Sequence, residues 1–194
     1  LVVFVSCSKG NSDYLFTKLE SSQTGIDFQN EVANGENMNI FKYRNFYNGG
    51  GVAIGDVNND GLSDIFVTSN FEDNKLYLNK GKMTFEDITV KAGIVGKKFW
   101  STGVTFADVN GDGFEDIYLC GAANQSGTLL YQDNKGHFNK LNRTDFQKNK
   151  AAEEVDAVFF DADADGDLDL YVVTGAYNQL ANSPILQDLY YQND

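Results

Sequence analysis

One short acidic pattern occurs three times in this chain of 194 residues, and the copies are almost evenly spaced. Each copy reads Asp-x-Asn/Asp-x-Asp-Gly-x-x-Asp and lies between two apolar runs. The first aspartates of the copies are Asp56, Asp108 and Asp161, so the offsets are 52 and 53 residues. Self-similarity at a fixed period of this length indicates a repeat architecture, in which each period forms one supersecondary unit.

The repetition continues beyond the acidic pattern. The run 76–81, which ends in Asn-Lys-Gly, is similar to 130–136, and the segment 189–194 begins the same feature. Asn-Lys-Gly steps are typical of hairpin turns that need positive φ. In the first period we expect strands at 52–55, 64–68, 75–79 and 83–88. Four short strands in about 50 residues have the size of one blade of a β-propeller.

The acidic pattern has the chemistry of a calcium loop. Calcium takes about 6–8 oxygen ligands at about 2.3–2.6 Å, and a glycine at the sixth loop position permits the sharp turn around the ion. Side chains at positions one, three, five and nine and the carbonyl at position seven would supply the oxygens. The expected ligands are Asp56, Asn58, Asp60, Leu62 and Asp64 in the first site, Asp108, Asn110, Asp112, Phe114 and Asp116 in the second, and Asp161, Asp163, Asp165, Asp167 and Asp169 in the third.

Other interpretations of the loops can be weighed against calcium. Mg²⁺ prefers a rigid octahedron with retained water. An EF-hand needs a glutamate at position twelve and flanking helices, whereas position twelve here is Val67, Leu119 or Val172 and the flanks resemble strands. An acidic turn that binds no metal remains the alternative. Three copies in register, each with its glycine, favour about three Ca²⁺ ions.

Composition agrees with a folded, cation-binding chain. It is 42% hydrophobic and 13% aromatic, which is enough to build a core. The formal net charge is −13, which argues against nucleic acid as a partner because phosphates would be repelled. Clustered acids favour cations instead.

The N-terminus has an apolar run, 1–5, followed by Ser6 and Cys7. The run is too short to span a bilayer. It resembles the end of a bacterial lipoprotein signal, with Phe4 where a leucine is usual, and Cys7 would then carry the lipid. A frayed apolar tail is the alternative. Cys120 lies in a strand-like run, so we expect a buried, inert thiol and no disulfide.

The sequence offers little for catalysis. The chain's single histidine, His137, follows a glycine in a turn and is expected at the surface. Nucleophile elbows, zinc-binding helical motifs and phosphate loops are absent from the sequence. Phe99 and Trp100 could line a sugar-binding face, but packing between blades is the preferred interpretation. We therefore expect a protein that is not an enzyme.

The segments 51–64 and 103–116 resemble the FG-GAP/VCBS repeats of integrin-α-type propellers. The runs 24–28 and 46–51 are similar to the opening of bacterial VCBS/ASPIC-UnbV-type secreted lipoproteins, so the resemblance covers 14–194. It implies an all-β fold, a partial β-propeller of about three four-stranded blades with calcium-binding inter-strand loops. Three blades do not close a ring, so the resemblance also implies an N-terminal fragment.

These inferences define an expected organisation and function. The expected parts are a signal-peptide remnant and tether (1–13), an N-terminal strand region (14–48), and repeats at 49–100, 101–153 and 154–194, the last truncated. The expected function is a calcium-binding propeller module of a secreted or surface-anchored bacterial lipoprotein that binds a protein or a glycan. The expected location is extracytoplasmic, either secreted or as an outer-membrane lipoprotein. The membrane would be reached only through Cys7. The alternatives are a carbohydrate-active propeller, either a lectin or a Ca²⁺-dependent polysaccharide lyase, and an adhesin.

Overall fold

The acidic loops lie between antiparallel strands, as predicted, in a computed structural model that describes residues 15–94, 100–141, 153–175 and 188–193. The elements are α1 (Ser21–Thr24), the 3-10 helix η1 (Arg44–Tyr47), β1 (Val52–Gly55), β2 (Asp64–Val67), β3 (Lys75–Asn79), β4 (Phe85–Asp87), β5 (Ser101–Ala107), β6 (Asp116–Gly121), β7 (Thr128–Gln132), β8 (Phe138–Lys140), β9 (Glu154–Phe160), β10 (Asp169–Thr174) and β11 (Leu189–Tyr191). The strands expected in the first period are therefore confirmed to within about two residues.

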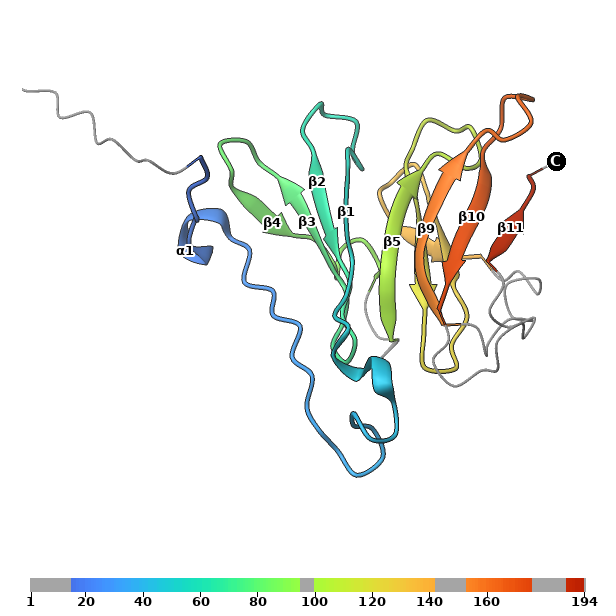
Figure 1. Ribbon diagram of the computed structural model, residues 1–194. Helices are drawn as coiled ribbons and strands as arrows, with labels where there is room; N and C mark the ends of the chain where they lie inside the picture. Colours follow the sequence, from blue (N-terminus) through green and yellow to red (C-terminus); the bar gives the residue numbers. More distant parts are fainter. Residues whose placement is uncertain (1–14, 95–99, 142–152, 176–187, 194) are drawn as a thin grey trace, which may run out of the picture.

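The strands form three antiparallel sheets, which we call blades. Blade one is β1-β2-β3-β4, blade two is β5-β6-β7-β8, and blade three is β9-β10-β11 within the described residues. Strands β1, β5 and β9 lie side by side, and the sheets extend away from them (Figure 1). This arrangement is a partial β-propeller and confirms the all-β fold class.

Each internal boundary between blades buries one apolar face of each sheet. We call the face of a blade that points to the next blade its trailing face, and the opposite one its leading face. On the trailing face of blade one, Ala53, Phe66 and Leu76 are paired across neighbouring strands and are all buried. They share a hydrophobic cluster with the leading face of blade two, which presents Val104, Ile117 and Leu119. Strand alternation thus gives each blade two packing surfaces.

The boundary between blades two and three repeats this pattern with different residues. Tyr118, Cys120 and Leu129 form the trailing face of blade two, and Ala157, Leu170 and Val172 form the leading face of blade three. All six residues are buried. The propeller core is therefore a series of inter-blade layers rather than one central cluster.

The strand pairing corrects one detail of the sequence alignment. The sequence suggested that Leu76 corresponds to Leu130. In the structure Leu76 pairs with Phe66, whereas Leu129 pairs with Tyr118 at the same place in blade two. The correspondence is shifted by one residue, because a similar Leu-Tyr step lies one position later on β7. Leu130 faces the opposite side of the sheet.

The first strands of adjacent blades, β1, β5 and β9, approach one another very closely near their N-terminal ends. A Cβ atom on Gly51 would lie 2.6 Å from the carbonyl oxygen of Thr102, and one on Gly103 would lie 2.6 Å from the carbonyl oxygen of Val155. Hydroxyl groups of Thr68, which follows β2, and of Thr102 in β5 form hydrogen bonds across the same two boundaries. Thr68 Oγ1 donates to the Thr102 carbonyl at 2.6 Å, and Thr102 Oγ1 donates to the Glu154 carbonyl at 2.5 Å. Glycine at these positions lets the backbones meet.

Glu154, the first residue of β9, places a carboxylate inside the boundary between blades two and three. Only 1% of the residue is exposed. Its Oε1 accepts the N–H of Gly127 at 3.0 Å, and its Oε2 accepts the N–H of Gly121 at 3.2 Å and the hydroxyl of Tyr118 at 3.1 Å. Burial raises the pKa of Glu154, and these hydrogen bonds oppose the rise. One side chain thus satisfies three donors of the neighbouring blade.

We expect Glu154→Gln to lower the free energy of unfolding by about 1–3 kcal/mol, because an amide accepts through one oxygen and leaves a buried backbone N–H without a partner. Urea unfolding measures the change. The matched control is Glu86→Gln, which alters an exposed carboxylate 3.7 Å from Lys80 and should change stability by less than about 0.5 kcal/mol. Equal losses in both variants would contradict a specific role for Glu154.

The N-terminal segment differs from its prediction. A strand region was expected at 14–48, but residues 15–48 contain α1 and η1 and no strand. Local polar contacts explain this. Glu20 and Gln23 form a capping box around α1, and the side chain of Asn39 accepts N–H groups of the turn that follows it. Such side-chain bonds compete with strand ladders.

Residues 32–47, which we call the N-terminal strap, cross the end of the blades opposite the acidic loops (Figure 1). The strap packs Tyr43 and Phe46 against Phe71 of blade one and Trp100 at the start of blade two. The Tyr43 hydroxyl also donates to Glu153 beside blade three. The strap therefore contacts all three blades.

No helix in the described part of the chain is long and apolar enough to cross a membrane.

Candidate metal sites

The three acidic loops join β1 to β2, β5 to β6 and β9 to β10, and they share one hydrogen-bonding scheme. In the first loop, Asp56 Oδ1 accepts the N–H of Asp60 at 3.0 Å, and Asp56 Oδ2 accepts the N–H of Gly61 at 2.7 Å. Asp108 makes the corresponding bonds in the second loop at 3.1 and 2.8 Å. Asp161 accepts the N–H of Gly166 at 3.2 Å. The first aspartate of each loop therefore folds the backbone around its own carboxylate.

The backbone of each loop turns through the left-handed region at the sixth position. The φ angles of Gly61, Gly113 and Gly166 are 83°, 88° and 100°, as the sequence predicted for this position. The fourth position is also left-handed, with φ values of 56° at Asn59 and 64° at Ala164. The loops are thus tightly curled at the same two positions.

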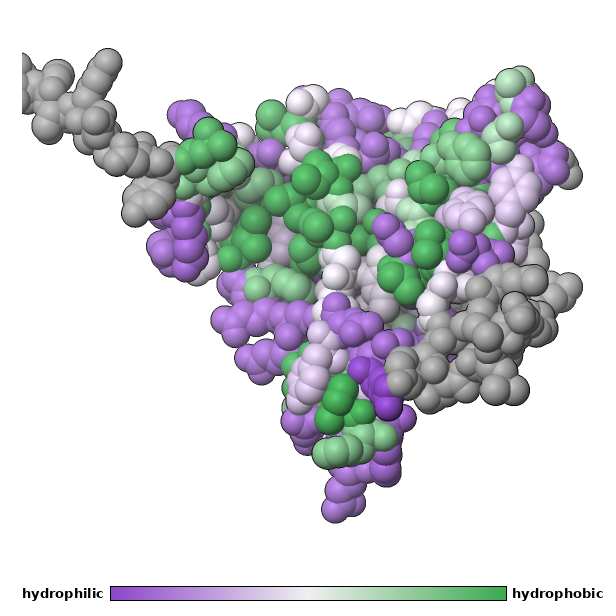
Figure 2. Space-filling model, viewed as in Figure 1, coloured by the Kyte–Doolittle hydropathy of each residue, from purple (hydrophilic) through white to green (hydrophobic). Residues whose placement is uncertain are grey.

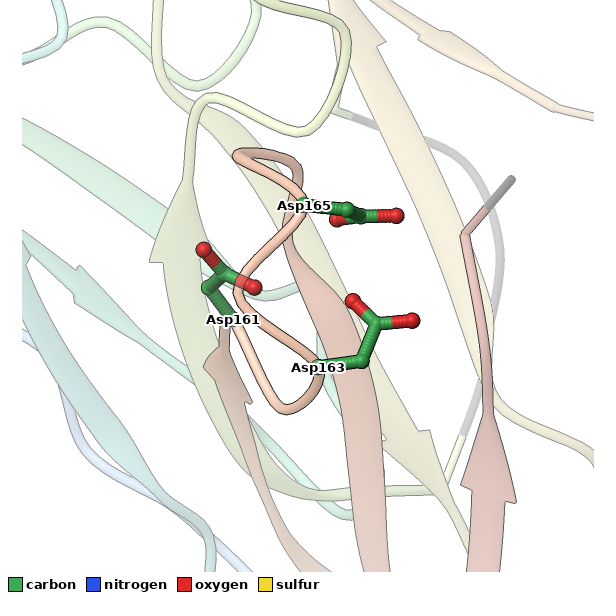
Figure 3. A group of neighbouring side chains, drawn as sticks. All are labelled: Asp161, Asp163 and Asp165. Carbon is green, nitrogen blue, oxygen red and sulfur yellow. The ribbon is translucent and has the colours of Figure 1, made fainter.

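In the third loop the structure brings three carboxylates together. Asp161, Asp163 and Asp165 each offer an oxygen, and these oxygens all lie within 4.8 Å of one another (Figure 3). Ligands about 2.3–2.6 Å from one calcium ion are separated by no more than about 5 Å, so the spacing fits this ion. All three residues are exposed and therefore accessible from solvent. In the first two loops an asparagine, Asn58 or Asn110, occupies the third position.

The charges in the third loop perturb one another. Loss of solvation and repulsion from Asp165 raise the pKa of Asp163. A hydrogen bond with Asp165 raises the pKa of Asp167 to about 6. The same hydrogen bond lowers the pKa of Asp165 below its usual range. Closely spaced carboxylates behave in this way when they must share protons. A divalent cation would relieve the same repulsion.

The aspartate at the ninth position has a second role that the sequence did not reveal. Asp64 is completely buried. Its Oδ2 accepts the N–H of Val57 at 3.0 Å, and its Oδ1 accepts the N–H of Asn79 at the end of β3 at 2.7 Å. An ionised carboxylate has about four acceptor positions, so both backbone bonds leave room for a metal. The ninth residue thus ties the loop to the third strand of its blade.

The same arrangement recurs in the other two blades. Asp116 accepts from Val109 and Gln132, and Asp169 accepts from Ala162 and Asn193. Desolvation raises the pKa of Asp116 to about 6, whereas the hydrogen bond from Asn193 contributes most to lowering that of Asp169. The sequence contains one sign of this role: in the first two repeats the ninth-position aspartate stands at a similar distance from the end of the third strand.

The seventh residue of each loop lies next to the fifth. The N–H groups of Leu62, Phe114 and Asp167 donate to the fifth-position carboxylates Asp60, Asp112 and Asp165 at 2.9, 2.9 and 3.2 Å. The seventh residue, whose carbonyl was expected to be a ligand, is therefore held beside the predicted acidic ligands in all three loops.

Neighbouring loops also contact each other. Asn59 Nδ2 in the first loop donates to the Gly113 carbonyl in the second at 2.8 Å. Asn193 Nδ2 in blade three donates to the Val109 carbonyl at 3.3 Å. These contacts between blades are not visible in the repeat pattern; they link the first loop to the second, and the second loop to the end of β11 in blade three.

The remaining residues singled out from the sequence lie away from the loops. Trp100 is only 4% exposed, which confirms that it is a packing residue, but it packs against Phe71 and the N-terminal strap rather than between two blades. Cys120 is buried and free, as expected, and burial raises the pKa of its thiol. His137 is exposed, with Nδ1 3.5 Å from Asp133. Cys7 and Phe99 lie outside the described residues.

Comparison with known proteins identifies the repeat. The model of the FG-GAP-like repeat matches residues 56–119 and 108–172, and these stretches include all three acidic loops. Cartilage acidic protein 1 of Xenopus tropicalis is 36% identical over 123 residues, which are 61% of this chain and 19% of that protein. The Homo sapiens protein of the same name is 39% identical over 72 residues, 37% of this chain and 11% of its own length. The chain thus spans less than a fifth of these relatives. Because the repeat model covers more than half of the chain, the protein belongs to the family of FG-GAP-like repeat proteins.

Proposed function

We propose that the chain is a calcium-binding β-propeller module for binding another macromolecule, and that each acidic loop holds one Ca²⁺. The FG-GAP-like repeats make it a propeller-type interaction module. The observation that carries the calcium proposal is the carboxylate cluster Asp161, Asp163 and Asp165, whose spacing suits one calcium shell. The first two loops share the backbone scheme of the third, so the same assignment extends to them.

Calcium has a structural role in this proposal. Three bound ions, each with two positive charges, would change the formal net charge from −13 to −7. Each ion would neutralise repulsion within a loop and hold together the first two strands of its blade, which the loop joins. Within this proposal the module is not an enzyme, and its propeller surface binds a protein or a glycan.

We further propose an extracytoplasmic location, on a secreted or lipid-anchored bacterial protein with Cys7 as the anchor. Millimolar calcium is found outside cells, where weak loop sites would be filled. Intact mass of the protein purified from membranes tests the anchor, because acyl chains add mass at Cys7. An unmodified cysteine in that preparation would contradict the anchor and leave the calcium proposal unaffected.

Isothermal titration with Ca²⁺ tests the loops, and the third loop offers a matched pair of variants. We expect three sites in the unmodified chain. Asp165→Asn should remove one site, because aspartate stands at this position in all three loops. Asp163→Asn makes the same chemical change at the position where Asn58 and Asn110 stand in the other loops, so it should keep three sites.

A stoichiometry of zero in the unmodified chain would refute the calcium proposal. Equal loss of binding in the two variants would show that net charge, rather than loop position, controls affinity.

The carbohydrate-active alternative receives no specific support in the described residues. Its aromatic candidate Trp100 is buried against Tyr43 and Phe71 and is not available to stack on a sugar. We therefore retain a binding module as the proposed function.

A further inference from the structure

A glutamate of blade two lies against the first acidic loop of blade one. Glu115 is the eighth residue of the second loop, but its side chain turns toward blade one. A Cβ atom added to Gly55, the last residue of β1, would lie 1.9 Å from Glu115 Oε2 and 2.9 Å from Glu115 Cδ. Gly55 directly precedes Asp56, the first residue of the first loop. The carboxylate of Glu115 therefore occupies the space of a missing side chain beside that loop.

The other internal boundary lacks this combination of residues. Between blades two and three, Ala107 and Leu168 stand at the positions of Gly55 and Glu115. Alanine leaves less room at the end of the strand, and leucine brings no charge. Gly55 does not have a positive φ, so the space that its neighbours need, rather than a turn, explains this glycine. The contact is a property of one boundary and not of the repeat.

Two buried polar atoms without hydrogen-bond partners lie in this boundary, within the part of the chain that the structure describes. They are Oε2 of Glu115 and Nε2 of Gln132, and Gln132 is only 3% exposed. The cross-strand pair Ile117 and Leu130 packs against blade one. Glu115 and Gln132 are two residues farther along the same strands, so they face blade one as well. Buried polar groups are normally hydrogen-bonded, so this part of the boundary is electrostatically unsatisfied.

The charges that act on Glu115 are of its own sign. Apolar side chains fill most of the boundary between blades one and two. Figure 2 shows hydrophilic residues at the edge that carries the first loop and apolar residues over the strands below it. Burial contributes most to raising the pKa of Glu115, repulsion from Asp56 and Asp64 adds to the rise, and the backbone of Asp56 opposes it. Glu115 thus adds a fourth carboxylate to the three aspartates of the first loop.

We propose that Glu115 couples the first loop to blade two, so that its charge strengthens Ca²⁺ binding by that loop from outside the ligand set. This inference rests on the calcium-binding function proposed above. A buried carboxylate beside Asp56 and Asp64 is costly in the absence of calcium. A divalent cation in the loop replaces this repulsion with attraction. Calcium in the first loop therefore also strengthens the boundary between blades one and two.

Isothermal titration of the full chain with Ca²⁺ tests the coupling. Glu115→Gln should keep three sites but lower the affinity of one of them about tenfold, because one neighbouring charge commonly changes the equilibrium of another charged group by this factor. The matched control is Glu86→Gln, which removes the same charge from an exposed side chain of β4. This control should leave all three affinities unchanged.

A second variant identifies the affected site. Asp60→Asn is expected to remove the first site, in the same way that Asp165→Asn removes the third. When Asp60→Asn is present, adding Glu115→Gln should leave the two remaining affinities unchanged. If Glu115→Gln weakened all three sites equally, or none, the coupling would be overturned and the calcium loops would stand. If the unmodified chain bound no calcium, the proposed function itself would fail and the coupling with it.

Thermal unfolding separates this coupling from a contact that only packs the boundary. In chelator, Glu115→Gln should melt no lower than the unmodified chain, because the amide has the same size and removes the repulsion from Asp56 and Asp64. In calcium its melting temperature should rise by about 3–6 °C less, since a tenfold loss of affinity corresponds to about 1.4 kcal/mol. Equal destabilisation with chelator and with calcium would show a packing role alone and would overturn the proposal.

Discussion

Removal of calcium is expected to lower the melting temperature of the chain by about 15–30 °C. A ligand present at a hundred times its dissociation constant stabilises the folded state by about 2.7 kcal/mol per site, so three filled loops contribute about 8 kcal/mol. For a chain of this size, each kcal/mol shifts the melting temperature by about 2–4 °C. Each loop joins the first and second strands of a blade, so loss of the ion is expected to weaken every blade.

Thermal unfolding followed by circular dichroism, with and without chelator, measures this effect. Return of Ca²⁺ should restore the original melting temperature, whereas an equal concentration of Mg²⁺ should restore it only in part, because Mg²⁺ keeps its water and demands octahedral geometry. A melting temperature that changes with neither chelator nor added calcium would refute the calcium proposal.

Substitution of Gly103 by alanine is expected to destabilise the chain by about 3 kcal/mol. The added Cβ would lie 2.6 Å from the Val155 carbonyl oxygen and 2.7 Å from the Cα of Asp156. Both are backbone atoms, so no side-chain rotation relieves the clash and blades two and three must separate. Overpacking of this kind costs about 1–3 kcal/mol, sometimes more, and a rigid backbone neighbour places this site at the upper end.

The control for this prediction is Gly35→Ala. A Cβ on Gly35 meets only the Met38 carbonyl oxygen, at the ordinary distance of 3.8 Å. That substitution should be nearly neutral or slightly stabilising, because alanine reduces the freedom of the unfolded chain. Denaturant unfolding of both variants compares them. If Gly103→Ala were as stable as Gly35→Ala, the inner strands would not pack as closely as described.

The sequence predicted the blade itself well because every element of a blade is local and occurs more than once. Strands β1 and β3 begin and end where the alternation of the first repeat placed them, and the curled loop follows from its glycine. Repetition supplies independent observations of one pattern, which compensates for the weakness of any single short strand signal.

Contacts between blades could not be predicted in this way. Nothing in the sequence distinguishes Glu154 from other strand residues, yet its carboxylate accepts the N–H groups of Gly121 and Gly127 in the preceding blade. Asn59 in the first loop likewise donates to Gly113 in the second loop, 54 positions later. Partners of this kind lie far apart along the chain. They also differ between copies, because different residues pack at each boundary.

The N-terminal segment was predicted incorrectly for a related reason. It belongs to no repeat, so its single copy offers no pattern against which to check a strand assignment. Its aromatic residues Tyr43 and Phe46 find their partners only after the blades have assembled.

The N-terminal strap has a consequence for the order in which the molecule folds. Each blade can form from a continuous stretch of about 50 residues, so its closure is entropically inexpensive. The bond from Tyr43 to Glu153 instead joins residues 110 positions apart. During synthesis the strap leaves the ribosome before the three blades, yet its contact with Glu153 must wait until the third blade has emerged. Final consolidation is therefore a late, non-local step that follows rapid formation of the individual sheets.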